Sequence, residues 1–193
     1  MRARILFAAA AALALSACFG GGAPSELFTL KADQTRPTGT ARTAAPGDTI
    51  TVVEPTVPVA LQNTRVPVYV APQTIQYLKN AFWADDPSEL FRSVLSETIA
   101  ATTNRVVLDP GQFTHEPGTR LTGQLILFGL DADRMEAVIL YDAVIARGRE
   151  ILVTNRFEAR VPVAAAQPAL VAPALNQAAN QVAAQVAQWI GAR

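Results

Sequence analysis

The chain has 193 residues, of which 50% are hydrophobic and 17% are charged, and its 16 Lys and Arg residues balance its 16 Asp and Glu residues. This composition is typical of one globular domain and excludes a disordered or collagen-like chain. Zero net charge without long basic runs argues against nucleic-acid binding. One Cys and one His exclude zinc fingers, disulfide scaffolds and multi-histidine metal sites.

The first 17 residues predict an export signal. A short basic segment precedes the apolar run Ile5–Leu15, which is too short for a transmembrane helix of about 20 residues. The run ends in Leu15-Ser16-Ala17-Cys18, which resembles the lipobox of bacterial lipoproteins. We therefore expect Cys18 to become the first residue of the mature chain. The alternative is an ordinary signal peptide that is cut near Ala17 and leaves a free thiol.

The lipobox resemblance implies a diacylglycerol on the Cys18 thiol and an N-acyl chain on the new amino terminus, and we expect no other cofactor. Several acyl chains together give stable membrane anchoring. Phe19 is not the Asp that retains lipoproteins in the inner membrane of enteric bacteria. The resemblance therefore favours a periplasmic protein anchored to the inner leaflet of the outer membrane. We expect residues 1–17 to be the signal peptide, 18–26 the lipidated Cys and a flexible Gly-rich stalk, and 27–193 a single periplasmic domain.

Short β-rich runs dominate the first half of this domain. Leu27–Leu30 could form an initial strand, and residues 31–48, rich in Thr, Ala, Gly and Pro, predict a loop. Alternating β-branched residues predict strands at Thr49–Val53 and Val66–Val70. Thr74–Trp83 is either a strand or a turn-rich segment.

Asp86-Pro87-Ser88-Glu89 predicts the start of a helix that runs to about Thr103. Asp86 is expected to cap the helix, Pro87 suits the first helical position, and Glu89 is expected to reach back to the cap. The apolar residues that follow form one stripe, which predicts a face packed on the core.

The second half predicts a β meander followed by a helix. Short strands are expected at Arg105–Leu108, and longer ones at residues 121–130, 136–146 and 151–161, the last three joined by loops short enough for antiparallel hairpins. Pro173–Ile190 has helical spacing and no charge. We therefore predict an α+β domain with a mostly antiparallel sheet, one central amphipathic helix and a C-terminal helix packed on it.

No catalytic or metal site is predicted. The single His115 lies in a loop-like segment, and the chain has neither a Gly-x-Ser-x-Gly elbow nor a phosphate-binding Gly-rich loop. The pair Asp131 and Asp133 lacks the further oxygen ligands of a calcium loop and is better explained as a polar hairpin tip. We therefore expect a protein that is not an enzyme and binds no metal.

Aromatic residues offer the best candidates for partner binding. Tyr77, Phe82 and Trp83 are concentrated beside an acidic pair, and Trp189 lies on the uncharged C-terminal helix. Trp and Tyr dominate interface hot spots, but such a group is also typical of a core. Both interpretations remain open, and a lipid-binding cavity is a third.

The order of these features resembles the ABC-type transport auxiliary lipoproteins, which include the Pqi-type lipoproteins and those found with Mce-domain lipid transporters. The resemblance depends on the lipobox, an early Phe28-Thr29-Leu30, the stretch from Ile50 to Val107 with Trp83-Ala84-Asp85-Asp86-Pro87 before a helix, the β meander and the C-terminal helix.

This resemblance implies a non-enzymatic component that docks the periplasmic part of an Mce-type ABC phospholipid transporter to a membrane. The Mce-domain protein, the permease and the ATPase would be its partners on separate chains, and homo-oligomerisation is left open. The alternative is a structural or assembly lipoprotein of the envelope unrelated to transport. A secreted hydrolase would require His115.

Overall fold

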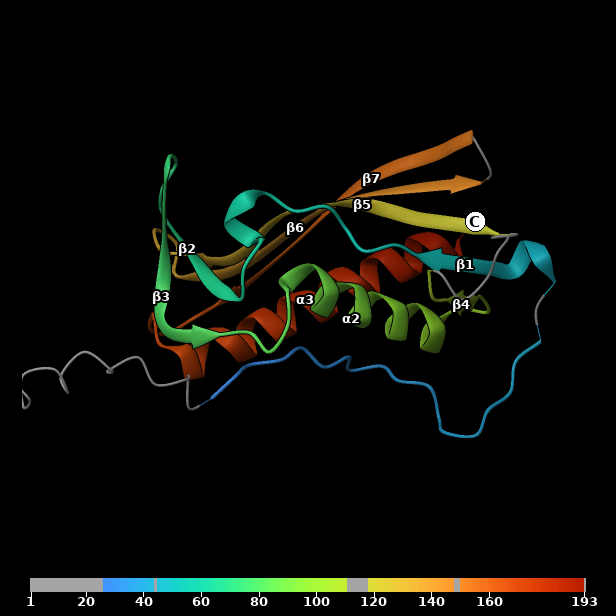
Figure 1. Cartoon of the computed structure of the whole chain (residues 1–193), viewed down its shortest axis with the longest axis horizontal. Helices are drawn as coiled ribbons and strands as arrows, with labels where there is room; N and C mark the ends of the chain where they lie inside the picture. The colour runs from blue at the N-terminus through green and yellow to red at the C-terminus, as the bar shows by residue number, and fades with distance from the viewer. Residues whose placement is uncertain (1–25, 44, 111–117, 148–149, 193) are drawn as a thin grey trace, which may run out of the picture.

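A seven-stranded mixed sheet with two long helices forms the domain, which confirms the predicted mixed α/β class (Figure 1). The computed structural model describes residues 26–43, 45–110, 118–147 and 150–192, so Cys18 and His115 lie outside the described residues. The elements in chain order are η2 Pro46–Asp48, β1 Thr49–Val52, η3 Val59–Leu61, β2 Arg65–Ala71, β3 Thr74–Phe82, α2 Pro87–Thr102, β4 Val106–Leu108, β5 Thr119–Asp131, β6 Glu136–Arg147, β7 Glu150–Pro162 and α3 Pro168–Gly191.

The long strand β5 organises the sheet. One edge of β5 pairs with β6 along its whole length, and β6 pairs in turn with β7. The other edge of β5 pairs in parallel with β1 at its start and with β2 at its end, with a bridge between Thr56 and Gln124 in the middle. The chain from β1 to β2 therefore follows a single edge of β5.

The sheet is mostly antiparallel, as predicted, but it also contains parallel pairs. The meander β5–β6–β7 is antiparallel, as expected. The β2–β3 hairpin, which the sequence left open, is also antiparallel, whereas β1–β4, β1–β5 and β2–β5 are short parallel pairs. An antiparallel hairpin can be predicted from the tight turn between its two strands. A parallel pair joins strands that are distant in the chain, so no local sequence pattern indicates it.

Helices α2 and α3 lie on the same face of the sheet (Figure 1). From α2, the Phe91 ring meets the Tyr141 ring of β6 edge-on at 5.2 Å between centroids. From α3, Trp189 meets Phe157 of β7 at 5.5 Å. The largest completely buried side chains between these layers are Trp83, Tyr141, Phe91, Phe128, Ile50, Leu61, Leu95, Ile99, Leu121, Leu125, Leu130 and Ile139.

Helix α2 begins at the predicted residue but not by the predicted side-chain cap. Asp86 is the N-cap and Pro87 the first helical residue, yet the Asp86 side chain makes no capping hydrogen bond. The Asp86 backbone N–H instead donates to the Asp85 carboxylate at 2.8 Å, and Glu89 bonds Arg92 rather than reaching back. The predicted capping box is therefore wrong: the Asp85 carboxylate accepts from the Asp86 N–H that Glu89 was expected to reach, and Glu89 bonds Arg92.

Helix α3 begins five residues earlier than predicted, at Pro168, and therefore contains Pro173. Proline in the second helical turn removes one hydrogen bond to the carbonyl four residues before it, here that of the exposed Ala169, which water can solvate. Burial of Val171 at 0% exposure favours the extra turn. The predicted start, Pro173, therefore lies in the second turn of α3, and the helix starts at the preceding proline, Pro168.

Two other local expectations are settled by the fold. Leu27–Leu30 is not a strand but contributes a single bridge from Phe28 to Trp83. Thr74–Phe82 is the strand β3, and its pairing with β2 is interrupted near Asn80, which has a positive φ of 55°. Among the described helices, none has the length and apolarity needed to cross a bilayer.

Candidate functional site

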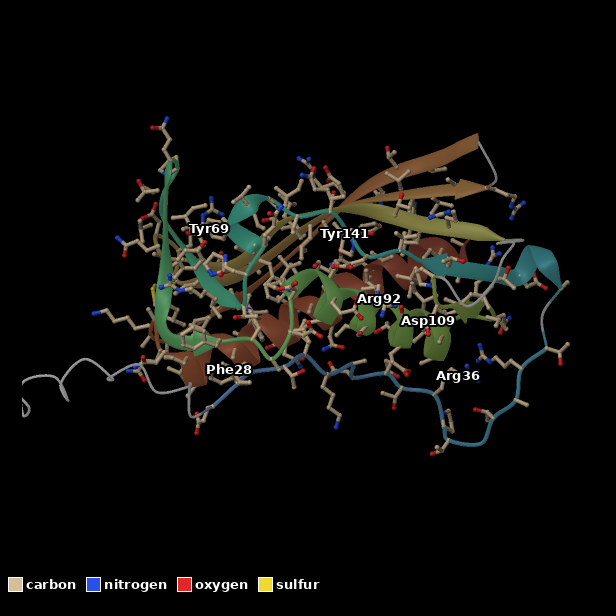
Figure 2. All side chains as sticks on the ribbon, viewed as in Figure 1. Phe28, Arg36, Tyr69, Arg92, Asp109 and Tyr141 are labelled. Carbon is tan, nitrogen blue, oxygen red and sulfur yellow. The ribbon has the colours of Figure 1, made fainter. Side chains whose placement is uncertain are left out.

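The first described residues form a strap, residues 27–33, that is fixed to the folded core. The Phe28 backbone N–H donates to the Phe82 carbonyl at 2.8 Å, and the Phe28 carbonyl accepts from the Ala84 N–H at 2.7 Å. The Phe28 ring meets the Trp83 ring edge-on at 6.5 Å. The beginning of the strap therefore lies beside the end of β3 (Figure 2).

Two asparagines of α3 hold the rest of the strap. Asn176 accepts from the Lys31 N–H at 2.7 Å, and Asn180 accepts from the Asp33 N–H at 2.7 Å. The Asn180 side-chain amide also donates to the Lys31 and Asn176 carbonyls, both at 2.9 Å. Asn180 is 7% exposed, so these bonds satisfy a nearly buried amide. Any pull on the chain before residue 27 would act on α3 and β3 through the strap.

Trp83 belongs to the core, which was one of the two interpretations of the aromatic group. Its side chain is 1% exposed and its ring also meets Phe128 at 5.3 Å. The indole N–H is buried without a hydrogen-bond partner. Trp83 therefore offers no surface to a partner in this structure.

Tyr77, Phe82 and Trp189 are each half-buried and keep some surface. The Tyr77 hydroxyl donates to the Ala60 carbonyl at 3.2 Å, and the Arg65 guanidinium lies 4.2 Å from the centre of the Tyr77 ring. Trp189 is near the C-terminal end of α3, at the opposite side of Figure 1 from β3. The predicted contact residues therefore do not form one continuous surface.

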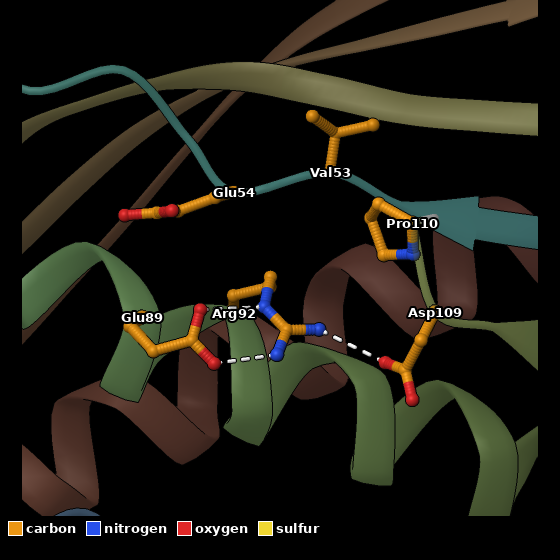
Figure 3. A pocket seen from close by; sticks show the side chains of 6 residues that line it. All are labelled: Val53, Glu54, Glu89, Arg92, Asp109 and Pro110. Atoms are coloured by element: carbon orange, nitrogen blue, oxygen red, sulfur yellow. Dashed lines mark hydrogen bonds and ion pairs between the residues drawn. The ribbon is translucent and has the colours of Figure 1, made fainter. Parts of the chain in front are cut away.

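A polar pocket with a volume of about 360 Å³ opens between the segment after β1, α2 and the end of β4 (Figure 3). Its lining residues are Val53, Glu54, Glu89, Arg92, Asp109 and Pro110. Arg92 donates to Glu89 on its own helix at 2.8 Å and to Asp109 after β4 at 3.1 Å. Deeper in, the Ser88 hydroxyl donates to Glu54 at 2.6 Å and is itself 4% exposed.

The charges of this pocket are used within the protein. Hydrogen bonds to Glu89, followed by the charges of Glu89 and Asp109, raise the pKa of Arg92 above its usual value despite its partial burial. Ser88 is nearly buried, so its hydroxyl has little access to a substrate, and its hydrogen bond to Glu54 joins α2 to the segment after β1. The arrangement ties β4 and the segment after β1 to α2, and Figure 2 shows Arg92 and Asp109 together on this side.

A second charge cluster lies on strands β5 to β7, around Arg160. Its guanidinium donates to Asp131 at 2.9 Å, to Glu136 at 3.3 Å and to Glu158. The Asp131 carboxylate therefore serves an ion pair, consistent with a polar hairpin tip and not with a calcium loop. Nearby, the hydrogen bond from Arg156 holds the pKa of Asp142 below its usual value.

No group of three His, Cys, Asp or Glu side chains is placed to hold a metal ion within the ranges that the structure describes. Sequence reasoning missed two features. One is the clasp, the pair Asn176 and Asn180 that holds the strap by hydrogen bonds, and the other is the ion-pair cluster of Arg92 with Glu89 and Asp109. Two Asn residues four positions apart on an otherwise Ala- and Gln-rich helix were the available signal for the clasp, but their strap partners are about 145 residues away.

Comparison with known proteins identifies the family. The model of the ABC-type transport auxiliary lipoprotein component matches residues 28–187. The chain belongs to this family. Its strap, its whole sheet and most of α3 lie within the match.

Solved structures share the fold at low sequence identity. Protein XCC0632 from Xanthomonas campestris has a TM-score of 0.70 at 16% identity, with 85% of this chain and 94% of that chain covered. An uncharacterized protein has a TM-score of 0.65 at 14% identity, with 86% and 99% covered. No curated protein matches the sequence significantly.

Family membership makes this chain an auxiliary component of an ABC-type transporter, associated with other transporter components. The family is described as a transport component and not as an enzyme, and as a lipoprotein it belongs to the membrane-anchored proteins of the cell envelope. The resemblance found from the sequence is thereby confirmed.

Proposed function

We propose that this lipoprotein docks the periplasmic part of an Mce-type ABC phospholipid transporter to a membrane, with an Mce-domain protein, a permease and an ATPase as partners. The family match over residues 28–187 is the observation that carries the proposal. A docking component needs affinity and a fixed anchor but no chemistry, and the polar groups of the Arg92 pocket are paired with one another.

The anchor in this proposal is Cys18, carrying a diacylglycerol and an N-acyl chain in the inner leaflet of the outer membrane. Residues 1–17 are then the signal peptide, and residues 18–26 connect the lipid to the domain. The strap supports this role because its hydrogen bonds to the end of β3, to Ala84 and to α3 would transmit a force on the anchor into the folded domain.

Surface contacts to the transporter are assigned to Tyr77, Phe82 and Trp189, since each keeps part of its ring accessible. Tyr77 and Trp189 lie in distant parts of the fold, so they would contact different partners or different parts of one partner. Homo-oligomerisation would place several copies of the Tyr77 and Trp189 surfaces on one assembly. The mass of the purified complex measures the number of copies.

The test is recovery of the full-length, C-terminally tagged chain from membranes solubilised in mild detergent, with Cys18→Ser as the matched control. We expect the wild-type chain to bring down the Mce-domain protein, permease and ATPase, and the control to leave the membrane fraction. Recovery of the wild-type chain alone, or with peptidoglycan or assembly factors, would replace the proposal with a structural lipoprotein. Loss of function in His115→Ala would point to a hydrolase instead.

A further inference from the structure

We infer that the start of α3 and the start of the strap form a membrane-contacting patch that rests on the lipid surface beside the anchor. The patch consists of Leu27, Ala166, Ala169, Leu170 and Pro173, all exposed. Leu27 is 55% exposed and Leu170 is 42% exposed, which places both among the exposed large hydrophobic side chains of the part of the chain that the structure describes. The inference rests on the proposed function, because it requires lipid on Cys18.

The register of the strap on α3 brings Leu27 to the patch. The Lys31 N–H donates to Asn176 and the Asp33 N–H donates to Asn180. A step of two residues along the strap therefore corresponds to a step of four residues along α3, and the two segments run in the same direction. Two extended residues and four helical residues both span about 6 Å. The same spacing carried backwards places Leu27 beside Pro168, the first residue of α3 and the neighbour of Ala169.

The length of chain before the strap places this patch near a bilayer. Seven residues lie between Cys18 and Glu26, and the eight Cα-to-Cα steps from one to the other span at most about 29 Å whatever their conformation. A lipidated Cys18 therefore holds the patch within that distance of the lipid headgroups. The far end of α3 lies roughly 30 Å further along the helix, so the patch is the part of α3 nearest to the anchored segment.

The chemistry of the patch fits a neutral lipid surface. No charged residue occurs from Val161 to Ala192, and the charged residues nearest to Leu27 in the sequence, Glu26 and Lys31, have opposite signs. Contact would therefore be made by apolar side chains at the headgroup boundary, without attraction to anionic lipids. The patch needs little affinity for lipid of its own. The lipid on Cys18 already tethers the chain to the membrane, so contact between the patch and the same membrane takes place at a high effective concentration.

The experiment uses the full-length lipoprotein, purified from membranes and returned to phosphatidylcholine vesicles that contain a headgroup-labelled nitroxide lipid. Because lipid blocks the thiol of Cys18, a single new cysteine accepts an environment-sensitive fluorophore. We compare Leu170→Cys with the matched control Gln188→Cys, an exposed site on the same helix about 27 Å away. Thermal unfolding of both labelled variants checks that they are folded.

We expect the label at position 170 to be quenched at least about twofold more strongly than the label at position 188, equally at low and high salt. Equal quenching at both positions would overturn the inference and leave the anchored function intact. Self-quenching at position 170 that grows with protein density, without quenching by the lipid, would assign the patch to contact between copies and also overturn it. Labelling of the wild-type chain at Cys18 would show a free thiol and would overturn the proposed function together with this inference.

Discussion

At the residue scale, Trp83 shows how burial decides the role of an aromatic side chain. The sequence places it in an aromatic group that suits an interface as well as a core, and its 1% exposure assigns it to the core. Its neighbours Phe28 and Phe128 come from the strap and from β5, so Trp83 connects three separate parts of the chain. A mutation there acts on the stability of the domain before it acts on binding.

We predict that Trp83→Ala lowers the free energy of unfolding by about 3–5 kcal/mol, because it leaves a cavity beside the Phe28 and Phe128 rings. Trp83→Phe should cost well under half of that, since it keeps a ring and removes an indole N–H that has no partner. Urea denaturation of both variants measures this difference. An unchanged midpoint for Trp83→Ala, with weaker transporter binding, would return Trp83 to the interface.

Asp131 predicts a pH dependence of stability. Burial alone would raise the pKa of this carboxyl, but hydrogen bonds from the Arg160 side chain and the Arg134 backbone N–H, with the charges of both arginines, lower it below 3.8. A carboxyl with a lowered folded-state pKa stabilises the fold above its unfolded-state pKa and loses this contribution as pH falls through the folded-state value. Glu136 faces the same Arg160 and is its other acidic partner across the hairpin.

We therefore expect Asp131→Asn to be less stable than wild type at neutral pH and to show a smaller loss of stability on acidification below about pH 4. Asp133→Asn, at the exposed neighbouring position, is the matched control. Urea midpoints measured between pH 7 and pH 3 test this. Parallel pH profiles for wild type and Asp131→Asn would contradict it.

At the element scale, the close approach of β2 to β5 depends on Gly129. A Cβ atom added at this residue would lie 2.4 Å from the Pro67 carbonyl oxygen and 3.1 Å from the Tyr69 ring. Tyr69 in turn accepts a hydrogen bond from the Phe128 N–H at 3.2 Å, next to the irregular pairing of β5 with β6. The parallel β2–β5 pair therefore has no room for a side chain here.

We predict that Gly129→Ala destabilises the domain by about 1–3 kcal/mol, because backbone must move to admit the methyl group. Gly47→Ala is the control, since a Cβ at Gly47 meets nothing within 4 Å, and it should change stability by less than about 0.5 kcal/mol. Thermal and urea unfolding of the two variants provide the comparison. Equal stability of both would mean that β2 and β5 are not held at this distance.

The strap is the second element whose attachment can be measured. Asn180→Ala removes one acceptor and two donated hydrogen bonds and leaves the Asp33 N–H without that partner. We expect a loss of about 1–3 kcal/mol in unfolding free energy and faster proteolysis within residues 27–33. The exposed neighbour Gln181→Ala should leave both quantities unchanged. Proteolysis that is equally slow in all three proteins would show that Asn180 does not hold the strap.

At the scale of the whole molecule, the strap is where the described chain begins to make the contacts that stabilise the fold. A chain that starts at Glu26 keeps every strap contact described above, whereas one that starts at Gln34 loses the contacts of Phe28, Lys31 and Asp33. We predict that the first keeps the unfolding midpoint of the mature protein and that the second loses roughly 2–4 kcal/mol, mostly from exposure of the Phe28 and Trp83 surfaces. Equal midpoints for the two truncated chains would contradict a structural strap.

The sequence by itself determined the features that depend on local pattern. Period-two alternation and tight turns located the hairpins β5–β6–β7, and the Asp86-Pro87 start and the apolar stripe located α2 to within a residue or two. The family resemblance followed from the order of these elements and is confirmed by the match over residues 28–187. These features can be predicted from the sequence because turn geometry and helix periodicity depend on residues that are close together in the chain.

Only the tertiary structure decided what distant residues do together. It placed Trp83 in the core, separated Tyr77 from Trp189, paired β1 and β2 in parallel with β5, and joined Lys31 and Asp33 to asparagines about 145 positions later. The expected bond from Glu89 back to the Asp86 N–H is also absent, because Asp85 accepts from this N–H and Arg92 binds the Glu89 carboxylate. Burial, parallel pairing and side-chain partners depend on contacts across the fold, and such contacts leave little trace in the local sequence pattern.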